Sequence, residues 1–318
     1  MLGKSLLKLF FTIILVSASG TGYSQSLASV DAKIKTYPST RFDSVAQLAT
    51  LIDRDFETKL EKVRAIYSWI TRNVAYSYDA QNSMSISYRS EIERVQKEKQ
   101  HQERIARITL RSKKAVCHGY ALLFKELCDQ LNIPCQVIRG FGKSFLSDIA
   151  TEYEINHAWN KVNIDGEDYL FDATWGAGYM NGSRFIRAVN YVYFMTPPEH
   201  FIKNHYPDIA SDALLDKVPG KQEFLLDPLV YDHALTDFDL MNPAIGVLRE
   251  DSTVEFEIVS SQAIRSIHAY VSGRFHNVLE LSAENDRYTF KIDLSNYNGR
   301  ELMLYLNDKA AFGFKIKP

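Results

Sequence analysis

The segment between Cys117 and Trp175 constrains the fold most, because a helical pattern and a hairpin pattern follow one another within it. After Cys117, apolar residues recur at steps of three and four as far as Leu131, which is typical of an amphipathic helix. Asn132 and then Pro134 end the pattern. Cys117 is therefore predicted in the first helical turn, where free backbone N–H groups and the helix dipole lower a thiol pKa.

A β-hairpin is predicted further along the same segment. Residues 157–164 and 167–175 are rich in β-branched and aromatic residues. Asp165 and Gly166 lie between them, and this dipeptide is a strong signal for a two-residue hairpin loop.

The register of this hairpin predicts which side chains share a face. If Ile164 pairs with Glu167, His157 faces Thr174, and Asp172 is a diagonal neighbour of His157 on the same face. A turn shifted back by one residue would make His157 face Asp172 directly. Both registers leave the imidazole within reach of the carboxylate, unless a bulge changes the parity.

Cys117, His157 and Asp172 together supply the groups of nucleophilic acyl chemistry. An imidazole can take the thiol proton, and a carboxylate can hold the imidazole in the required tautomer. Each residue also has a structural interpretation: a buried cysteine, a hydrogen-bonded strand histidine or a turn aspartate. The combination of all three favours chemistry.

The motifs that contain these residues resemble the core of the transglutaminase-like superfamily, and in particular its kyphoscoliosis-peptidase-like branch. The resemblance covers residues 45–215 well and the remainder more loosely. The matching segments are Cys117-His118-Gly119-Tyr120-Ala121, His157-Ala158-Trp159-Asn160, Asp172-Ala173-Thr174-Trp175-Gly176, residues 65–76, residues 193–198 and residues 201–207.

The resemblance implies an α+β, papain-like core. It implies Cys117 as nucleophile, His157 as base and Asp172 as the orienting carboxylate. The backbone N–H of Cys117 is the expected oxyanion donor, and Tyr76 is an alternative to the upstream tryptophan of the animal transglutaminases, for which the chain shows no clear counterpart. No calcium loop or other cofactor or metal motif is recognisable, so neither a cofactor nor a metal is predicted.

The N-terminal residues have the layout of a secretory signal peptide. Lys4 and Lys8 precede an apolar run at residues 9–16, and small or polar residues follow to position 24. The run is short for a bilayer span, although an uncleaved anchor is an alternative. We therefore expect a signal peptide at residues 1–24, a secreted or periplasmic location, and no membrane span after cleavage.

Composition excludes some classes of partner. The 318 residues carry a net charge of −2, so no basic excess indicates nucleic-acid binding. The charged stretch at residues 88–114 is interpreted as a solvated helix, with a docking surface for an acidic partner as the alternative. Cys128 and Cys135 are expected as buried thiols or as a disulfide, and the sequence leaves this choice open.

A second domain is predicted at residues 224–318, after a transglutaminase-like domain at residues 25–223. Short alternating runs separated by turns indicate an all-β, immunoglobulin-like sandwich that could dock a protein. The examples are residues 253–259, 267–271, 288–292 and 302–306.

The sequence as a whole predicts an exported cysteine enzyme that acts on protein or peptide amides through a thioester, with hydrolysis preferred. The alternatives are a glutamine-crosslinking transglutaminase with the same first half-reaction, and a non-catalytic binding or scaffold protein with the same fold.

Overall fold

The computed structural model describes residues 27–37, 42–80, 90–250, 252–295 and 299–317. The predicted signal peptide lies outside these residues. Within them, no helix has both the length and the apolar character needed to cross a membrane.

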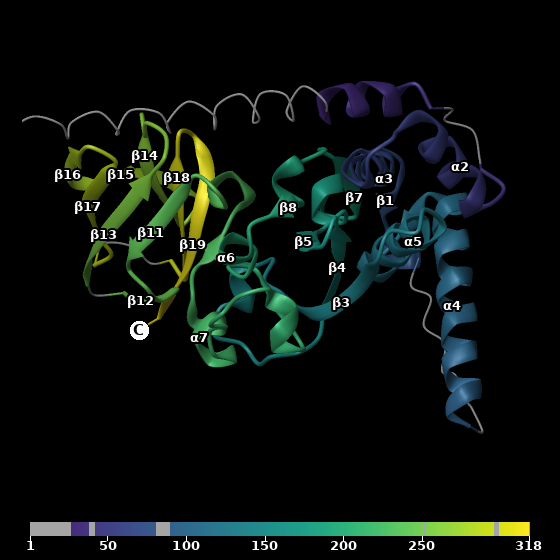
Figure 1. Ribbon diagram of the computed structural model, residues 1–318. Helices are drawn as coiled ribbons and strands as arrows, with labels where there is room; N and C mark the ends of the chain where they lie inside the picture. The colour runs from purple at the N-terminus through teal and green to yellow at the C-terminus, as the bar shows by residue number, and fades with distance from the viewer. Residues whose placement is uncertain (1–26, 38–41, 81–89, 251, 296–298, 318) are drawn as a thin grey trace, which may run out of the picture.

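In the N-terminal half, helices pack against one antiparallel sheet (Figure 1). Some of its strands are neighbours in the sequence, and others are far apart in it. The strand order is β8-β5-β4-β3-β9, so the predicted hairpin is central. Two further short pairs, β1-β2 and β6-β7, flank it. The elements are α2 (Val45–Asp55), α3 (Lys59–Asn73), β1 (Ala75–Tyr76), α4 (Glu91–Ser112), β2 (Lys114–Ala115), α5 (Cys117–Gln130), β3 (Cys135–Gly142), β4 (His157–Ile164), β5 (Glu167–Phe171), β6 (Gly178–Asn181), β7 (Arg184–Arg187), β8 (Phe194–Thr196), α6 (Pro198–Phe201), β9 (His205–Pro207) and α7 (Lys221–Leu226).

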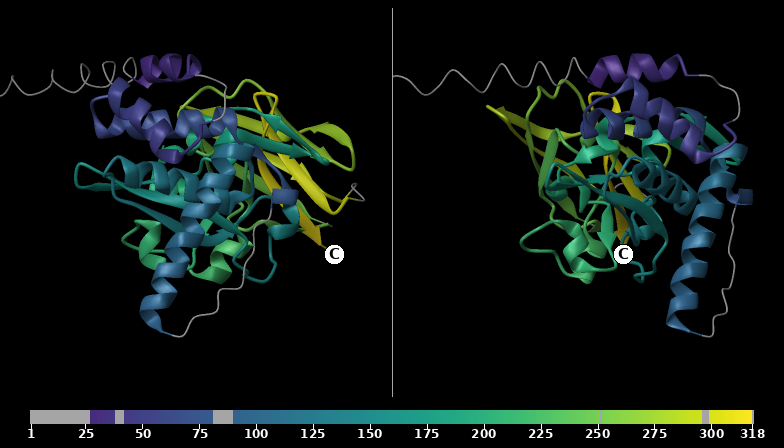
Figure 2. Two further views of the ribbon diagram at one scale, coloured as in Figure 1. Left: turned by 90° about the vertical axis from the view of Figure 1, so that its right-hand side faces the viewer. Right: turned by 45° about the vertical axis from the view of Figure 1, so that its right-hand side comes forward.

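Helix α5 begins at Cys117, as the apolar spacing predicts. Its buried face includes Leu123, Phe124 and Leu127, and the ring of Phe124 lies 5.7 Å from that of Phe171 on β5. The helix therefore packs directly on the central sheet. The long charged stretch forms α4, which projects beside α5 in both turned views (Figure 2).

The register of the hairpin is confirmed. Ile164 pairs with Glu167, and Asp165 and Gly166 both have positive φ, as the turn requires. Strand β5 ends at Phe171, earlier than predicted, so cross-strand pairing stops before Asp172.

Two antiparallel-rich sheets make up the C-terminal half (Figure 1). One has the order β10-β19-β18-β14-β15, with β12 on β19, and the other β11-β13-β17-β16. Phe256 and Phe290 of the second sheet stack, and Phe256 meets Phe314 of the first edge-to-face, so the two sheets share a core. The strands are β10 (Leu229–Val230), β11 (Phe238–Asn242), β12 (Val247–Arg249), β13 (Thr253–Ser260), β14 (Ile267–Val271), β15 (Arg274–Asn277), β16 (Leu279–Glu284), β17 (Arg287–Asp293), β18 (Glu301–Leu306) and β19 (Lys309–Lys317).

These paired sheets agree with the predicted sandwich, and its immunoglobulin-like topology stays a prediction. The proposed boundary at residue 224 also stays a prediction. Phe224 itself packs with Phe141 and Tyr206 of the N-terminal half, whereas Leu229 opens the C-terminal sheets.

Gly140 allows β9 to lie against β3. A Cβ at this position would lie 2.1 Å from the backbone oxygen of Tyr206 and 2.6 Å from Cη2 of Trp159. We expect Gly140→Ala to lower the free energy of unfolding by about 3 kcal/mol, because backbone must move to relieve the overlap. Denaturant unfolding measures this. Gly220→Ala is the control, since nothing lies within 4 Å of its Cβ; an equal effect of both changes would contradict the prediction.

Candidate active site

The thiol of Cys117 lies at the start of α5, directly after the short strand β2. Val116, the N-cap residue, provides no side-chain hydrogen bond to the helix start. Burial raises the pKa of the Cys117 thiol, but a hydrogen bond from His157 and its charge outweigh this, so the pKa is lowered overall. The thiol and the imidazole are therefore close enough for each to change the pKa of the other.

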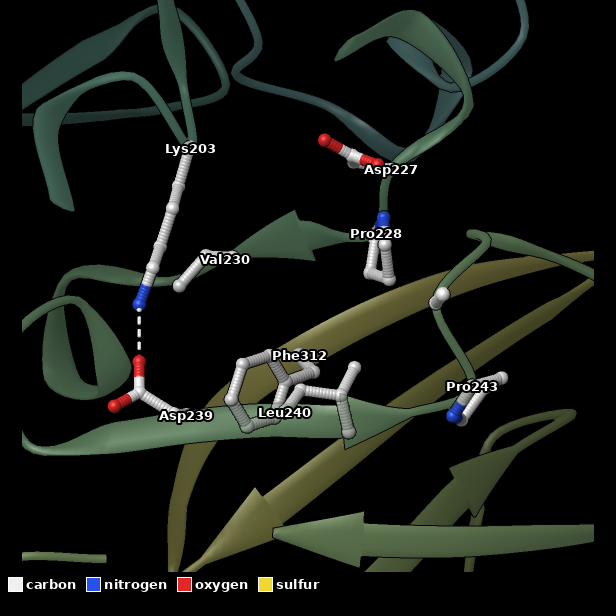
Figure 3. A pocket seen from close by; sticks show the side chains of 9 residues that line it. Lys203, Asp227, Pro228, Val230, Asp239, Leu240, Pro243 and Phe312 are labelled. Atoms are coloured by element: carbon white, nitrogen blue, oxygen red, sulfur yellow. Dashed lines mark hydrogen bonds and ion pairs between the residues drawn. The ribbon is translucent and has the colours of Figure 1, made fainter. Parts of the chain in front are cut away.

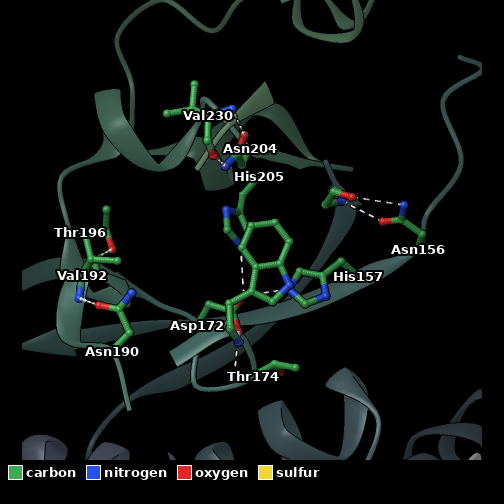
Figure 4. A network of polar contacts seen from close by, with 12 residues as sticks. Asn156, His157, Asp172, Thr174, Asn190, Val192, Thr196, Asn204, His205 and Val230 are labelled. Carbon is green, nitrogen blue, oxygen red and sulfur yellow. Dashed lines mark hydrogen bonds and ion pairs between the residues drawn. The ribbon is translucent and has the colours of Figure 1, made fainter. Parts of the chain in front are cut away.

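His157 is the first residue of β4, and its position depends on the neighbouring strand β3. A Cβ on Gly142 would lie 2.9 Å from that of His157, so the glycine leaves room for the imidazole. The side-chain oxygen of Asn156 accepts a hydrogen bond from the N–H of Gly142 at 2.7 Å. These contacts fix the place where β4 begins (Figure 4).

Asp172 is fully buried just after β5 and accepts four hydrogen bonds. Its Oδ1 accepts from the backbone N–H groups of Thr174 at 2.8 Å and Trp175 at 3.1 Å. Its Oδ2 accepts from Nε2 of His157 at 2.7 Å and Nε2 of His205 at 3.0 Å. A carboxylate has about four acceptor positions, and these donors use all of them.

Asp172 and the two histidines shift the pKa values of one another. Burial alone would raise the pKa of Asp172, but His157 and His205 hold it well below its usual range. Burial alone would lower the pKa of His157, but Asp172 and then Cys117 raise it to about 10. Because Nε2 of His157 faces the carboxylate, Nδ1 is the nitrogen that can take the thiol proton.

His157 and Asp172 therefore come together as predicted, although their contact differs in one respect from the prediction. Asp172 reaches His157 from the turn that follows β5 and not from a paired strand position. The catalytic roles of Cys117, His157 and Asp172 stay proposals.

His205 is absent from the predicted site. It lies 33 residues after Asp172 on a strand of three residues, too short for a recognisable alternation. The sequence does offer one indication of His205, because this residue lies in the segment 201–207 that resembles the superfamily.

The spacing of three of these side chains is also compatible with a metal ion. His157, Asp172 and His205 each offer one ligand atom within 4.8 Å of the others. Two hydrogen bonds to Asp172 already account for this clustering. We therefore assign no metal, and metal-free chemistry stays a prediction.

The oxyanion donor stays open. Pairing of β1 with β2 places Tyr76 opposite Ala115, two residues before Cys117. Burial and then the negative charge of a Cys117 thiolate raise the pKa of Tyr76, so its phenol keeps its proton. Tyr76 and the backbone N–H of Cys117 are both compatible with the role.

Cys128 and Cys135 are free thiols, both buried. Burial, and then the neighbouring Cys135, raise the pKa of Cys128 well above its usual range. The thiol of Cys128 therefore keeps its proton.

A separate pocket of about 250 Å³ lies between the two halves of the chain (Figure 3). Lys203 forms an ion pair with Asp239 of β11 at its edge, at 2.8 Å. The remaining lining is Asp227, Pro228, Val230, Leu240, Pro243, Ala244 and Phe312. None of the candidate catalytic residues lines this pocket.

Comparison with known proteins agrees with this geometry. Residues 46–173 match the model of the transglutaminase-like superfamily. The chain carries a transglutaminase-like domain. The kyphoscoliosis peptidase of Homo sapiens is 31% identical over 198 residues, which are 60% of this chain and 28% of that protein. The resemblance to the kyphoscoliosis-peptidase-like branch is thereby confirmed.

Two further relatives are more distant. A Lim and transglutaminase domain protein of Caenorhabditis elegans is 25% identical, over 59% of this chain and 25% of that protein. Cytokinesis protein 3 of Saccharomyces cerevisiae is 28% identical, over 59% of this chain and 20% of that protein. The chain spans about a quarter of the length of these curated relatives. The domain supports a cysteine-based enzyme family.

Proposed function

We propose that this chain is an exported cysteine acyl-transfer enzyme that hydrolyses peptide or side-chain amides. The observation that carries the proposal is the 2.7 Å hydrogen bond between His157 and the fully buried Asp172, with the thiol of Cys117 beside the same imidazole. Export rests on the sequence of residues 1–24 alone.

In the proposed reaction the thiolate of Cys117 attacks the amide carbonyl carbon. The C–N bond breaks as the His157 imidazolium gives its proton to the departing amine, and a thioester remains. Water then attacks the thioester, His157 takes its proton, and the thiolate leaves with release of a carboxylic acid. Asp172 stabilises the imidazolium in both halves.

Hydrolysis is preferred to amine transfer because the 31% identical relative is named a peptidase. Both reactions use the same thiol and imidazole to form the thioester. An experiment therefore has to show whether water or an amine accepts the acyl group.

The test is a peptide library incubated in ¹⁸O-labelled water, with and without an added primary amine, and read by mass spectrometry. We expect new carboxyl groups that carry ¹⁸O, and no product with Cys117→Ala. Amine adducts in place of labelled acids would identify a transglutaminase. If no product forms and Cys117 reacts no faster than a free thiol, the chain is a binding or scaffold protein.

A further inference from the structure

His205 contacts the same carboxylate as His157, and the centroids of the two imidazole rings lie 5.5 Å apart. Nε2 of His205 is 3.0 Å from Asp172 Oδ2, the same oxygen that His157 contacts at 2.7 Å (Figure 4). The histidine is 1% exposed, so water does not compete for this hydrogen bond.

Aromatic rings enclose His205. Its ring stacks on Phe201 with centroids 3.9 Å apart, and Trp175 lies at 4.2 Å. Burial lowers the pKa of His205 to about 4, although its hydrogen bond to Asp172 acts in the opposite direction. The ring is therefore neutral, and because Asp172 is an acceptor, the one ring proton lies on Nε2 and points at the carboxylate.

An apolar side chain would fit this aromatic surrounding at a lower desolvation cost than an imidazole. What a histidine adds at this position is the Nε2–H donor to Asp172, which an apolar residue lacks. Loss of that donor would leave Oδ2 with His157 as its single partner and would allow the carboxylate to turn about its bond.

We propose that His205 is a positioning residue, whose Nε2–H holds Asp172 Oδ2 toward His157 and so helps to keep Cys117 ionised. This inference rests on the proposed function, because it assigns a role within the same site.

The other titratable groups near Asp172 do not change charge in the working range. Tyr67 of α3 and Tyr193 of η4 (Tyr191–Tyr193) are fully buried, and burial raises the pKa of both well above the usual value. Burial, together with the charge of Asp172, also raises the pKa of Tyr76 of β1 and of Tyr120 of α5, so both phenols keep their protons. His157 of β4 and Cys117 of α5 are the groups near the carboxylate whose charge can change near neutral pH.

The test compares two side chains of similar length. His205→Gln keeps a donor that can reach Asp172, whereas His205→Met fills the space without one. We expect His205→Met to slow the alkylation of Cys117 by iodoacetamide at pH 6 by about 10- to 100-fold, by analogy with the loss of a hydrogen-bond partner behind a metal-ligating histidine or carboxylate. The pH profile of alkylation should shift upward in this variant, and His205→Gln should stay within about threefold of the unaltered protein.

The outcomes separate a failure of this inference from a failure of the proposed function. Alkylation in His205→Met as fast as in the unaltered protein, with Cys117 still activated, would overturn the inference alone. Equal slowing by Gln and Met would assign His205 to packing. If Cys117 of the unaltered protein reacts no faster than a free thiol, the proposed function fails and the inference with it. Should His205→Met not fold, His205→Asn replaces it, since its shorter amide does not reach Asp172, and full reactivity of that variant would overturn the proposal.

Discussion

Replacement of His157 by alanine is expected to slow alkylation of Cys117 by iodoacetamide at pH 6 by about two orders of magnitude. An ordinary thiol with a pKa of about 8.5 is ionised to only about 0.3% at pH 6. In this chain the hydrogen bond and charge of His157 lower the pKa of Cys117 against the effect of burial. Without the imidazole, burial alone remains, and it favours the protonated thiol.

The pH dependence of the alkylation rate tests the direction of the Cys117 pKa shift independently. The pKa of Cys117 is lowered and that of His157 is raised to about 10, so the thiolate–imidazolium pair forms at a lower pH than that at which an ordinary thiol ionises. The rate for the unaltered protein should therefore level off at a lower pH than the rate for His157→Ala, which should rise about tenfold per pH unit from pH 6 to 8. His118→Ala is the control, and we expect a change of less than about threefold. Equal rates for His157→Ala and the unaltered protein would refute activation by His157.

Asp172→Asn is expected to lower the turnover number for amide hydrolysis by about 10³- to 10⁴-fold, the size of effect known for loss of an orienting carboxylate. All four neighbours of Asp172 are N–H donors. The NH₂ group of the asparagine would face some of these N–H donors, so buried N–H groups would lose their acceptor. It would also favour the wrong tautomer of His157.

The measurement is single-turnover hydrolysis of a peptide that the library identifies, with unfolding recorded in parallel. Asp168→Asn is a matched control, because Asp168 lies on β5 four residues before Asp172 and its exposed carboxylate accepts from Asn163. Activity of Asp172→Asn above a tenth of that of the unaltered protein would show that the carboxylate is not needed for catalysis.

Local rules were sufficient to predict most of the site. The helix that begins at Cys117 follows from apolar spacing, and the register of the hairpin follows from the turn at Asp165 and Gly166, because both depend on residues near in the sequence. Asp172 illustrates the limit. Its carboxylate caps the following turn through Thr174 and also contacts His157, so the structural interpretation is confirmed and the orienting role stays a prediction.

Contacts between distant segments could not be predicted in the same way. His205 reaches Asp172 because β9 pairs with β3, and only the fold brings these strands together. Strand β19, central to its sheet, was likewise absent from the predicted strands, since Gly313 and the apolar run around it interrupt simple alternation. Packing, and not local pattern, decides both.

Three successive residues face three different parts of the molecule. Lys203 pairs with Asp239 of β11, Asn204 donates to the backbone oxygen of Val230 on β10, and His205 donates to Asp172. These contacts join the two halves of the chain next to the candidate site. Replacing the C-terminal half by another domain would remove the first two anchors of the tripeptide whose third member contacts the carboxylate.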